Sequence, residues 1–238
     1  MASEPLLKRV HARRLREVYR SAGWPSQDVV EIELLAAGLL ERLTAATGHD
    51  YVRVTDAGIQ HLASAAQSNR NVFTAHEALV EKVAQTMLRD GRLVWRNLSL
   101  RARLPAQDDL PARWKMSRPD VFSIRNSSVQ AYLEPIVHEI KVSRADLLGD
   151  LKHLDKRNAY LDVGGQCWYV LGCDGKGRAI GEADEIPLEC GVMVCLDNKL
   201  EVIRMAPKRP APQLPFGVWM ALAKATPVSM STDITDHL

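Results

Sequence analysis

Two oppositely charged side chains on one apolar strand constrain this chain more than any other feature. Residues 132–142 are typical of a β-strand, and Glu139 and Lys141, two positions apart, project from the same face of it. Burying such charges is costly unless they are paired or bind an ion. Asp120, after Pro119, precedes them by about one β-hairpin. Two carboxylates with an ammonium beside them predict a site for a hard divalent cation, where the lysine would face a water or a phosphate.

Charge and composition are those of an ordinary globular protein. With 238 residues, 46% hydrophobic and 25% charged, the chain has room for one large domain or two small ones. The formal net charge of +2 does not by itself indicate a nucleic-acid binder. Charge is uneven, however, because residues 89–118 hold eight Lys or Arg against three acids. Since this run directly precedes Asp120, it predicts a phosphate-binding surface rather than only a solvated face.

Other features argue against secretion, membranes and a zinc site. The four cysteines lack CxxC spacing, and those in apolar runs are typical of reduced buried thiols. Residues 1–20 have no apolar signal region, and no apolar run approaches the ~20 residues that span a bilayer. We therefore expect a reducing, cytoplasmic location and no membrane partner.

The first part of the chain predicts a small helical domain over residues 1–68. Its expected elements are helices over 5–20 and 26–43, a strand over 51–54, and a helix over 56–66 capped by Thr55. Ser26 is the expected N-cap of the second helical segment, in which Gly38 either separates two helices or is tolerated within one. The segments AAGLLERL and YVRVTDAGIQHL resemble a winged-helix domain. That resemblance implies contacts with the DNA backbone, or alternatively a dimerisation or protein-docking role. A homodimer is possible.

A polar segment, 68–71, predicts a link to a second domain over 72–226, followed by a frayed polar tail, 227–238. The order of elements predicts an α/β fold, a mixed sheet flanked by helices. We expect helices over 74–90, 143–161 and 216–225, strands over 93–100, 121–124, 132–142 and 166–171, a hairpin over 192–203, and a loop over 104–118.

The ordered motif resembles the PD-(D/E)xK nuclease superfamily. Pro119-Asp120 and Glu139-Ile140-Lys141 match its motif, and a helix bearing Glu77 precedes them. The stretches HEIKVSRADLLGDLKHLDKRNAYLD, QCWYVL and IPLECGVMVCLDNKLEVIRMAP look like its MmcB-type branch, which is related to DNA repair, over about residues 75–225. The chain departs from that branch between Lys152 and Tyr160 and carries the additional N-terminal domain. The resemblance implies a restriction-endonuclease-like sheet.

The resemblance also assigns roles to residues. Asp120, Glu139 and the carbonyl of Ile140 would hold Mg²⁺, with Mn²⁺ as a possible substitute, and Lys141 would orient the attacking water or stabilise the transition state. Glu77 would complete the metal shell, although a structural role is equally open. The residues expected to contact DNA phosphates are Arg96, Arg118, Arg144 and Lys152. Asp146 is interpreted as part of a helix cap with Ser143, and His138 faces away from Glu139 and receives no catalytic role.

These features predict a metal-dependent deoxyribonuclease, an endonuclease, that acts in repair, recombination or defence against foreign DNA. One alternative is a non-catalytic DNA-binding or regulatory protein on a nuclease-like scaffold, and another is RNA as the substrate. The presence of Asp120, Glu139 and Lys141 together favours the enzyme.

Overall fold

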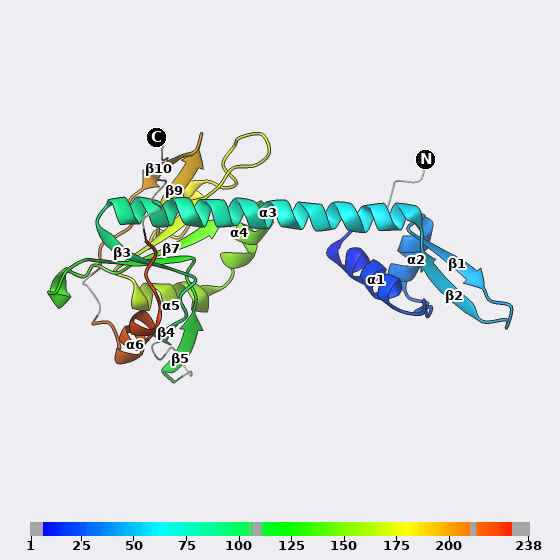
Figure 1. The fold of residues 1–238 in the computed structure, drawn as a ribbon, viewed down its shortest axis with the longest axis horizontal. Helices are drawn as coiled ribbons and strands as arrows, with labels where there is room; N and C mark the ends of the chain where they lie inside the picture. Colours follow the sequence, from blue (N-terminus) through cyan, green and yellow to red (C-terminus); the bar gives the residue numbers. More distant parts are fainter. Residues whose placement is uncertain (1–6, 105, 107–110, 210–212, 230–238) are drawn as a thin grey trace, which may run out of the picture. The chain divides into compact units, whose positions relative to one another are not determined.

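The computed structural model describes residues 7–104, 106, 111–209 and 213–229. The chain forms two units, Met1–Phe73 and Thr74–Leu238, and each is considered by itself (Figure 1). The boundary lies beside the expected link at 68–71. No helix among the described residues combines the length and apolarity needed to cross a bilayer.

The first unit packs two helices and a hairpin against the beginning of a third helix. Its core comprises Leu15, Val18, Leu34, Leu39, Leu40, Val52 and Val54. Gly23 has a positive φ of 78°, and a side chain there would collide with the Val52 carbonyl, so the turn after the first helix requires glycine. The winged-helix resemblance stays a prediction. The elements are α1 (Arg9–Arg20), α2 (Val29–Ala36), β1 (Leu40–Thr44), β2 (Asp50–Val54) and the start of α3 (Asp56–Arg89).

The helix expected over 26–43 was wrong at both ends. Asp28, not Ser26, caps α2 by accepting a hydrogen bond from the Glu31 amide. Gly38 then adopts a positive φ of 67°, which ends the helix, and the chain continues as β1. The apolar run could not distinguish the two states because it is continuous through this turn. Thr55 does cap α3, since its hydroxyl accepts from the Gly58 amide at 3.1 Å.

The predicted link at 68–71 is instead helical. α3 runs without interruption from Asp56 to Arg89, because residues 68–71 contain no proline or glycine and their serine and asparagines are only weakly unfavourable in a helix. Side chains from 66 to 75 are exposed throughout. Apolar periodicity, which reports packing, is therefore lost there while the helix persists.

The second unit is built on a six-stranded mixed sheet, which confirms the expected α/β class. The strand order is β10-β9-β8-β7-β6-β3, in which β7, β8 and β9 are parallel and the outer pairings are antiparallel. The strands are β3 (Arg92–Arg96), β6 (Val121–Arg125), β7 (Ile136–Lys141), β8 (Gln166–Leu171), β9 (Gly191–Leu196) and β10 (Lys199–Arg204).

Each face of this sheet has its own core. The C-terminal half of α3 packs Val80, Val83 and Ala84 against Ile140 and Val170. The opposite face is covered by α5, α6 and the small β4–β5 sheet (Figure 1). Period-two alternation along β7 therefore sends Glu139 and Lys141 to one face and His138 to the other, as predicted. The remaining elements are β4 (Leu100–Leu104), β5 (Arg113–Ser117), α4 (Arg144–Asp150), α5 (Leu154–Val163) and α6 (Phe216–Lys224), with short 3₁₀ turns at Gln130–Tyr132 and Ala183–Glu185.

Three further expectations for the second unit were wrong. The strand expected over 93–100 divides into β3 and β4, because Asn97 adopts a positive φ of 52° between them. The loop expected over 104–118 contains β5, paired with β4; residues 105 and 107–110 of it lie outside the described part. In the tail, Val228 donates to the Val94 carbonyl at 2.8 Å rather than fraying, and residues 230–238 lie outside the described residues.

His138 gives the fold an acid-sensitive point. It is fully buried, neither ring nitrogen has a partner among the described residues, and burial lowers its pKa from 6.5 to about 3. Between these values the unfolded chain binds the proton and the folded chain does not, so stability falls as pH falls from 6.5 towards 3. At pH 5 we expect a cost of about 2 kcal/mol. Urea unfolding of wild type and His138→Phe between pH 7.5 and 5 tests this: the variant should lose this dependence, and equal slopes would contradict it.

Candidate active site

Asp120 is fixed where two strands of the sheet separate. β6 begins at Val121, opposite His138, and beyond this point β7 continues without a β6 partner. The Ile140 amide, which would otherwise lack a partner on that side, donates to Asp120 Oδ2 at 2.7 Å. The carboxylate of Asp120 is thus held beside the residue that follows Glu139. The pairing of β6 with β7 thus brings Asp120 close to Glu139, as the motif predicts.

Glu139 lies at the centre of a buried polar cluster. Only 3% of its surface is exposed. Its Oε1 accepts from Lys141 Nζ at 2.7 Å and from Lys156 Nζ at 2.6 Å, while its Oε2 accepts from the Tyr160 hydroxyl at 2.7 Å. Lys156 and Tyr160 lie four residues apart on α5 and so present one helix face to the sheet. Three donors therefore fix the orientation of this carboxylate.

Lys141 is surrounded by carboxylates and is closed to solvent. Its side chain is 6% exposed, and its Nζ lies 3.4 Å from Asp150 Oδ1 and 3.1 Å from Asp146 Oδ2, in addition to Glu139. Asp150 also accepts from Lys156 at 2.5 Å and from the Tyr169 hydroxyl at 2.9 Å. The expected cap was wrong: the Ser143 side chain makes no capping bond, and Asp146 pairs with Lys141.

The cluster shifts the pKa of Glu139 and of both of its lysines. Burial raises the pKa of Glu139, and the negative charge of Asp120 raises it further, against the opposing effect of Lys141. Burial alone would lower the pKa of Lys141, but Glu139 and Asp150 raise it by more, so the ammonium stays charged. The same balance raises the pKa of Lys156. The electrostatic coupling of Asp120 with Glu139 is what two neighbouring carboxylates of one site would show.

Glu77 lies outside this cluster. Its carboxylate accepts from Arg96 at 2.8 Å and faces His76 Nδ1 at 3.3 Å. The other ring nitrogen of His76 lies 3.5 Å from Asp120 Oδ1, so the imidazole stands between the two acids. Asp120 and Glu77 raise the pKa of His76 against the effect of burial. A direct role for Glu77 in the metal shell is not evident from these contacts.

The four residues expected to contact DNA fall into two groups. Arg96 is held between Glu77 and Glu81, and Arg144 pairs with Glu185 at 2.5 Å, so these two guanidinium groups are already ion-paired. Arg118 and Lys152 are exposed and lie beside the cluster. A phosphate could reach the second pair without displacing a carboxylate.

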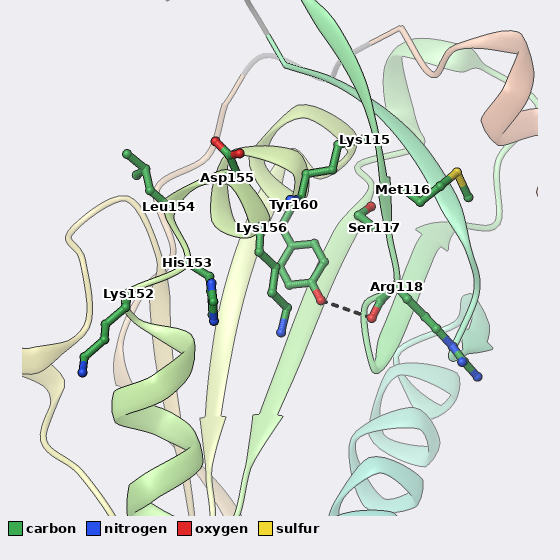
Figure 2. Close-up of a pocket in the computed structure, with 10 residues that line it drawn as sticks. All are labelled: Lys115, Met116, Ser117, Arg118, Lys152, His153, Leu154, Asp155, Lys156 and Tyr160. Atoms are coloured by element: carbon green, nitrogen blue, oxygen red, sulfur yellow. Dashed lines mark hydrogen bonds between the residues drawn. The ribbon is translucent and has the colours of Figure 1, made fainter.

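A basic hollow opens next to the cluster (Figure 2). It has a volume of about 600 Å³ and is bounded by β5, by the connection between α4 and α5, and by α5 itself. We call it the basic hollow. Lys152 and His153 stand on one side of Tyr160 and Arg118 on the other, and the Tyr160 hydroxyl oxygen lies 3.1 Å from the Arg118 carbonyl oxygen. Lys156 and Tyr160 both line the hollow and contact Glu139, so they connect it to the buried carboxylate.

Sequence reasoning did not assign Lys156, Tyr160 or Asp150 to the site. It expected one helix over 143–161, whereas α4 ends at Asp150 and α5 begins at Leu154. Because the helix is interrupted, Lys156 and Tyr160 point in a different direction from the one that a single continuous helix would give them. Their spacing of four was a usable signal, because a lysine and a tyrosine at that distance share a face.

The donor chemistry of the pair fits Mg²⁺ or Mn²⁺. Asp120 and Glu139 supply hard oxygens, and Mg²⁺ typically takes one or two carboxylates and completes its shell with waters and substrate phosphate. The cluster also sets the carboxylates of Glu139, Asp146 and Asp150 against the two ammonium groups of Lys141 and Lys156. Among the described residues, no group of three or more His, Cys, Asp or Glu side chains is placed to hold a metal ion.

Comparisons with known proteins add little to this geometry. No family model matches the chain, and no curated protein matches it. One solved structure is similar, the SPO1766 protein of unknown function from Silicibacter pomeroyi, at 22% identity and a TM-score of 0.41. The match covers 63% of this chain and 87% of that one. A likeness at this level says nothing about activity.

Proposed function

We propose that this chain is a metal-dependent nuclease that hydrolyses phosphodiester bonds in DNA on a restriction-endonuclease-like, PD-(D/E)xK fold. One observation carries the proposal: the buried carboxylate of Glu139, coupled to Asp120, is connected through Lys156 and Tyr160 to an open basic hollow. Paired carboxylates provide metal ligands, and a basic surface beside them provides phosphate binding. Repair, recombination or defence in the cytoplasm are the settings that suit such an enzyme.

The reaction requires charge stabilisation and an oriented water. A water oxygen bonds to phosphorus, the bond from phosphorus to the leaving sugar oxygen breaks, and that oxygen takes up a proton. A metal held by Asp120, Glu139 and the Ile140 carbonyl would polarise the phosphate and lower the pKa of the water. Tyr160 orients Glu139 through its hydroxyl. Asp120 is held through Oδ2 by the Ile140 amide, and its Oδ1 lies 3.5 Å from His76 Nε2.

Lys156 is better placed than Lys141 to meet the substrate. Its side chain is 32% exposed, against 6% for Lys141, and it lines the basic hollow. Because its pKa is raised, Lys156 stays protonated and acts through its charge rather than as a base. Lys141, held by three carboxylates, balances the buried negative charge. The lysine of the motif and the lysine that contacts phosphate are, in this proposal, different residues.

Replacing Lys156 with methionine should therefore slow cleavage strongly without unfolding the protein. Loss of one positioned charge from the reacting centre typically costs about 10²–10³ in rate. Lys141 remains beside Glu139 and Asp150, and because Lys156 is 32% exposed, water can replace part of its contacts, so the melting temperature should fall less than in a Lys141 variant. Single-turnover rates and thermal melts of Lys156→Met and Lys156→Arg measure both effects, and Arg should retain part of the rate. An unchanged rate in Lys156→Met would show that Lys156 does not contact the reacting phosphate.

A non-catalytic DNA-binding protein is the second candidate. It is favoured by the completeness of the ionic cluster, since both oxygens of Glu139 already accept hydrogen bonds from protein donors. Such a network can be stable without a metal ion. Incubation of the full chain with supercoiled, linear, branched and single-stranded DNA, in Mg²⁺, Mn²⁺ or EDTA, separates the candidates. Metal-dependent cleavage supports the nuclease, and binding without cleavage of any substrate supports the scaffold.

A further inference from the structure

The basic hollow has the charge of a phosphate site. Lys115, Arg118, Lys152 and Lys156 line it, and the single acid in its lining, Asp155, is paired with Arg113 at 2.5 Å. Among the described residues, Lys115 and Lys152 take part in no ion pair. Arg118 donates its Nε to the Asn97 carbonyl at 3.0 Å, which leaves its terminal nitrogens for another acceptor. Unpaired cations on opposite walls favour a ligand with negative charge along its length.

The walls also offer surfaces on which a base can rest. His153 is exposed and stands beside Lys152 at the rim (Figure 2). Met116 and Leu154, which also line the hollow, are 62% and 50% exposed. Exposed apolar side chains of this size next to cations are not explained by the core, which they do not join. Single-stranded nucleic acids bind where a positive groove carries the backbone and flat or apolar side chains receive the bases.

The size of the hollow favours unpaired over paired DNA. The hollow is open to solvent, and its volume of about 600 Å³ is of the order of a site for one small molecule, ~300–1,000 Å³. A duplex lying across it could present its phosphates to the cations, but only an unpaired nucleotide could bring its base to the exposed apolar side chains. Enzymes that reach a nucleotide in a hollow either act on single strands or extrude it from the helix. The continuity with Glu139 through Lys156 and Tyr160 places that nucleotide next to the proposed reacting centre.

We infer that the basic hollow receives an unpaired nucleotide adjoining the cleaved bond, so that the substrate is single-stranded DNA or a duplex with a single-stranded end. Lys115, Arg118 and Lys152 hold its flanking phosphates, and His153 stacks on its base. The position of the nucleotide beside a cleaved bond rests on the proposed nuclease function, whereas binding of the nucleotide does not. The residues of β5 and of the connection between α4 and α5, rather than the carboxylates, then determine whether single-stranded or duplex DNA is bound.

Binding in EDTA tests the inference separately from cleavage. Fluorescence anisotropy would compare the full chain on a blunt duplex, the same duplex with 5′ or 3′ single-stranded ends, and the single strand alone. The test variant is Lys152→Ala/His153→Ala, in which both side chains are exposed, so folding is preserved. The control is Lys208→Ala, an exposed lysine beside Gln166 at the start of β8 that does not line the hollow. Thermal melts would verify that both variants fold.

We expect wild type to bind single-stranded ends more tightly than blunt duplex, and the double variant to lose about tenfold on the single-stranded ends alone. Lys208→Ala should bind like wild type. Equal wild-type affinity for blunt and single-stranded ends would overturn the inference. An equal loss of affinity for both substrates in the double variant would also overturn it, because it would show that these residues contribute only surface charge. If selective binding appears and no metal supports cleavage, the nucleotide site stands and the nuclease function fails.

Discussion

Asp120→Asn should abolish cleavage while leaving the protein as stable as wild type. The expected loss is about 10³-fold or more, because the variant removes one of the two carboxylates proposed to hold the metal. Stability should be maintained for two reasons. An asparagine oxygen can still accept from the Ile140 amide, as Asp120 Oδ2 does at 2.7 Å. In addition, removal of the Asp120 charge relieves a contribution that raises the pKa of Glu139.

A carboxylate that destabilises its neighbour and yet is essential for a reaction marks a functional site rather than a structural one. Cleavage rates and urea unfolding of the same preparations measure both properties. The matched control is Asp174→Asn, which removes a partly exposed acid that is paired with Arg178 and neither lines the hollow nor contacts the cluster. Cleavage by Asp120→Asn at the wild-type rate would exclude Asp120 from the reaction.

Lys141→Met should be the most destabilising substitution in the cluster. The lysine neutralises Glu139 and Asp150, both almost fully buried, and also contacts Asp146. Removing one partner from a buried ion pair leaves an uncompensated charge, which typically costs about 3–5 kcal/mol. Loss of activity in this variant would then report unfolding as much as chemistry. Urea unfolding at pH 7.5 gives the free energy directly.

The double variant Lys141→Met/Glu139→Gln isolates the charge effect. Gln carries no charge, so the penalty of the single lysine substitution should be partly recovered, and the two substitutions should be strongly non-additive. Lowering the pH should also reduce the penalty in the single variant, since Glu139 already has a raised pKa and protonation removes its charge. A loss below 1 kcal/mol in Lys141→Met, or strict additivity, would show that Lys141 does not neutralise this carboxylate.

The part of the site that sequence could predict is the part set by strand periodicity and order. Glu139 and Lys141 lie on one face because side chains alternate along a strand, and Asp120 meets Ile140 because β6 and β7 are neighbours in the sheet. The same rule correctly directed His138 to the opposite face. The mixed sheet followed from the order of elements, since helices alternate with apolar strands in this half of the chain.

What could not be predicted depends on where helices begin and end. The exposed stretch of α3 gave no apolar signal, so one helix was divided into two. Between α4 and α5 the opposite error joined two helices, because the turn there contains neither glycine nor proline. That error misplaced the face that Lys156 and Tyr160 share, so its direction towards Glu139 was missed. The burial of Lys141 was likewise invisible, since it requires Asp150 and Asp146 to meet it across the fold.

One measurement tests the central claim most directly: the single-turnover rate at which the wild-type chain cleaves an end-labelled duplex with a single-stranded end, in Mg²⁺ and in EDTA. The site described here predicts cleavage in Mg²⁺ that disappears in EDTA and in Asp120→Asn, and that persists in Lys208→Ala. Absence of cleavage in both Mg²⁺ and Mn²⁺, or cleavage that survives EDTA or Asp120→Asn, would contradict a metal-dependent nuclease centred on Asp120 and Glu139.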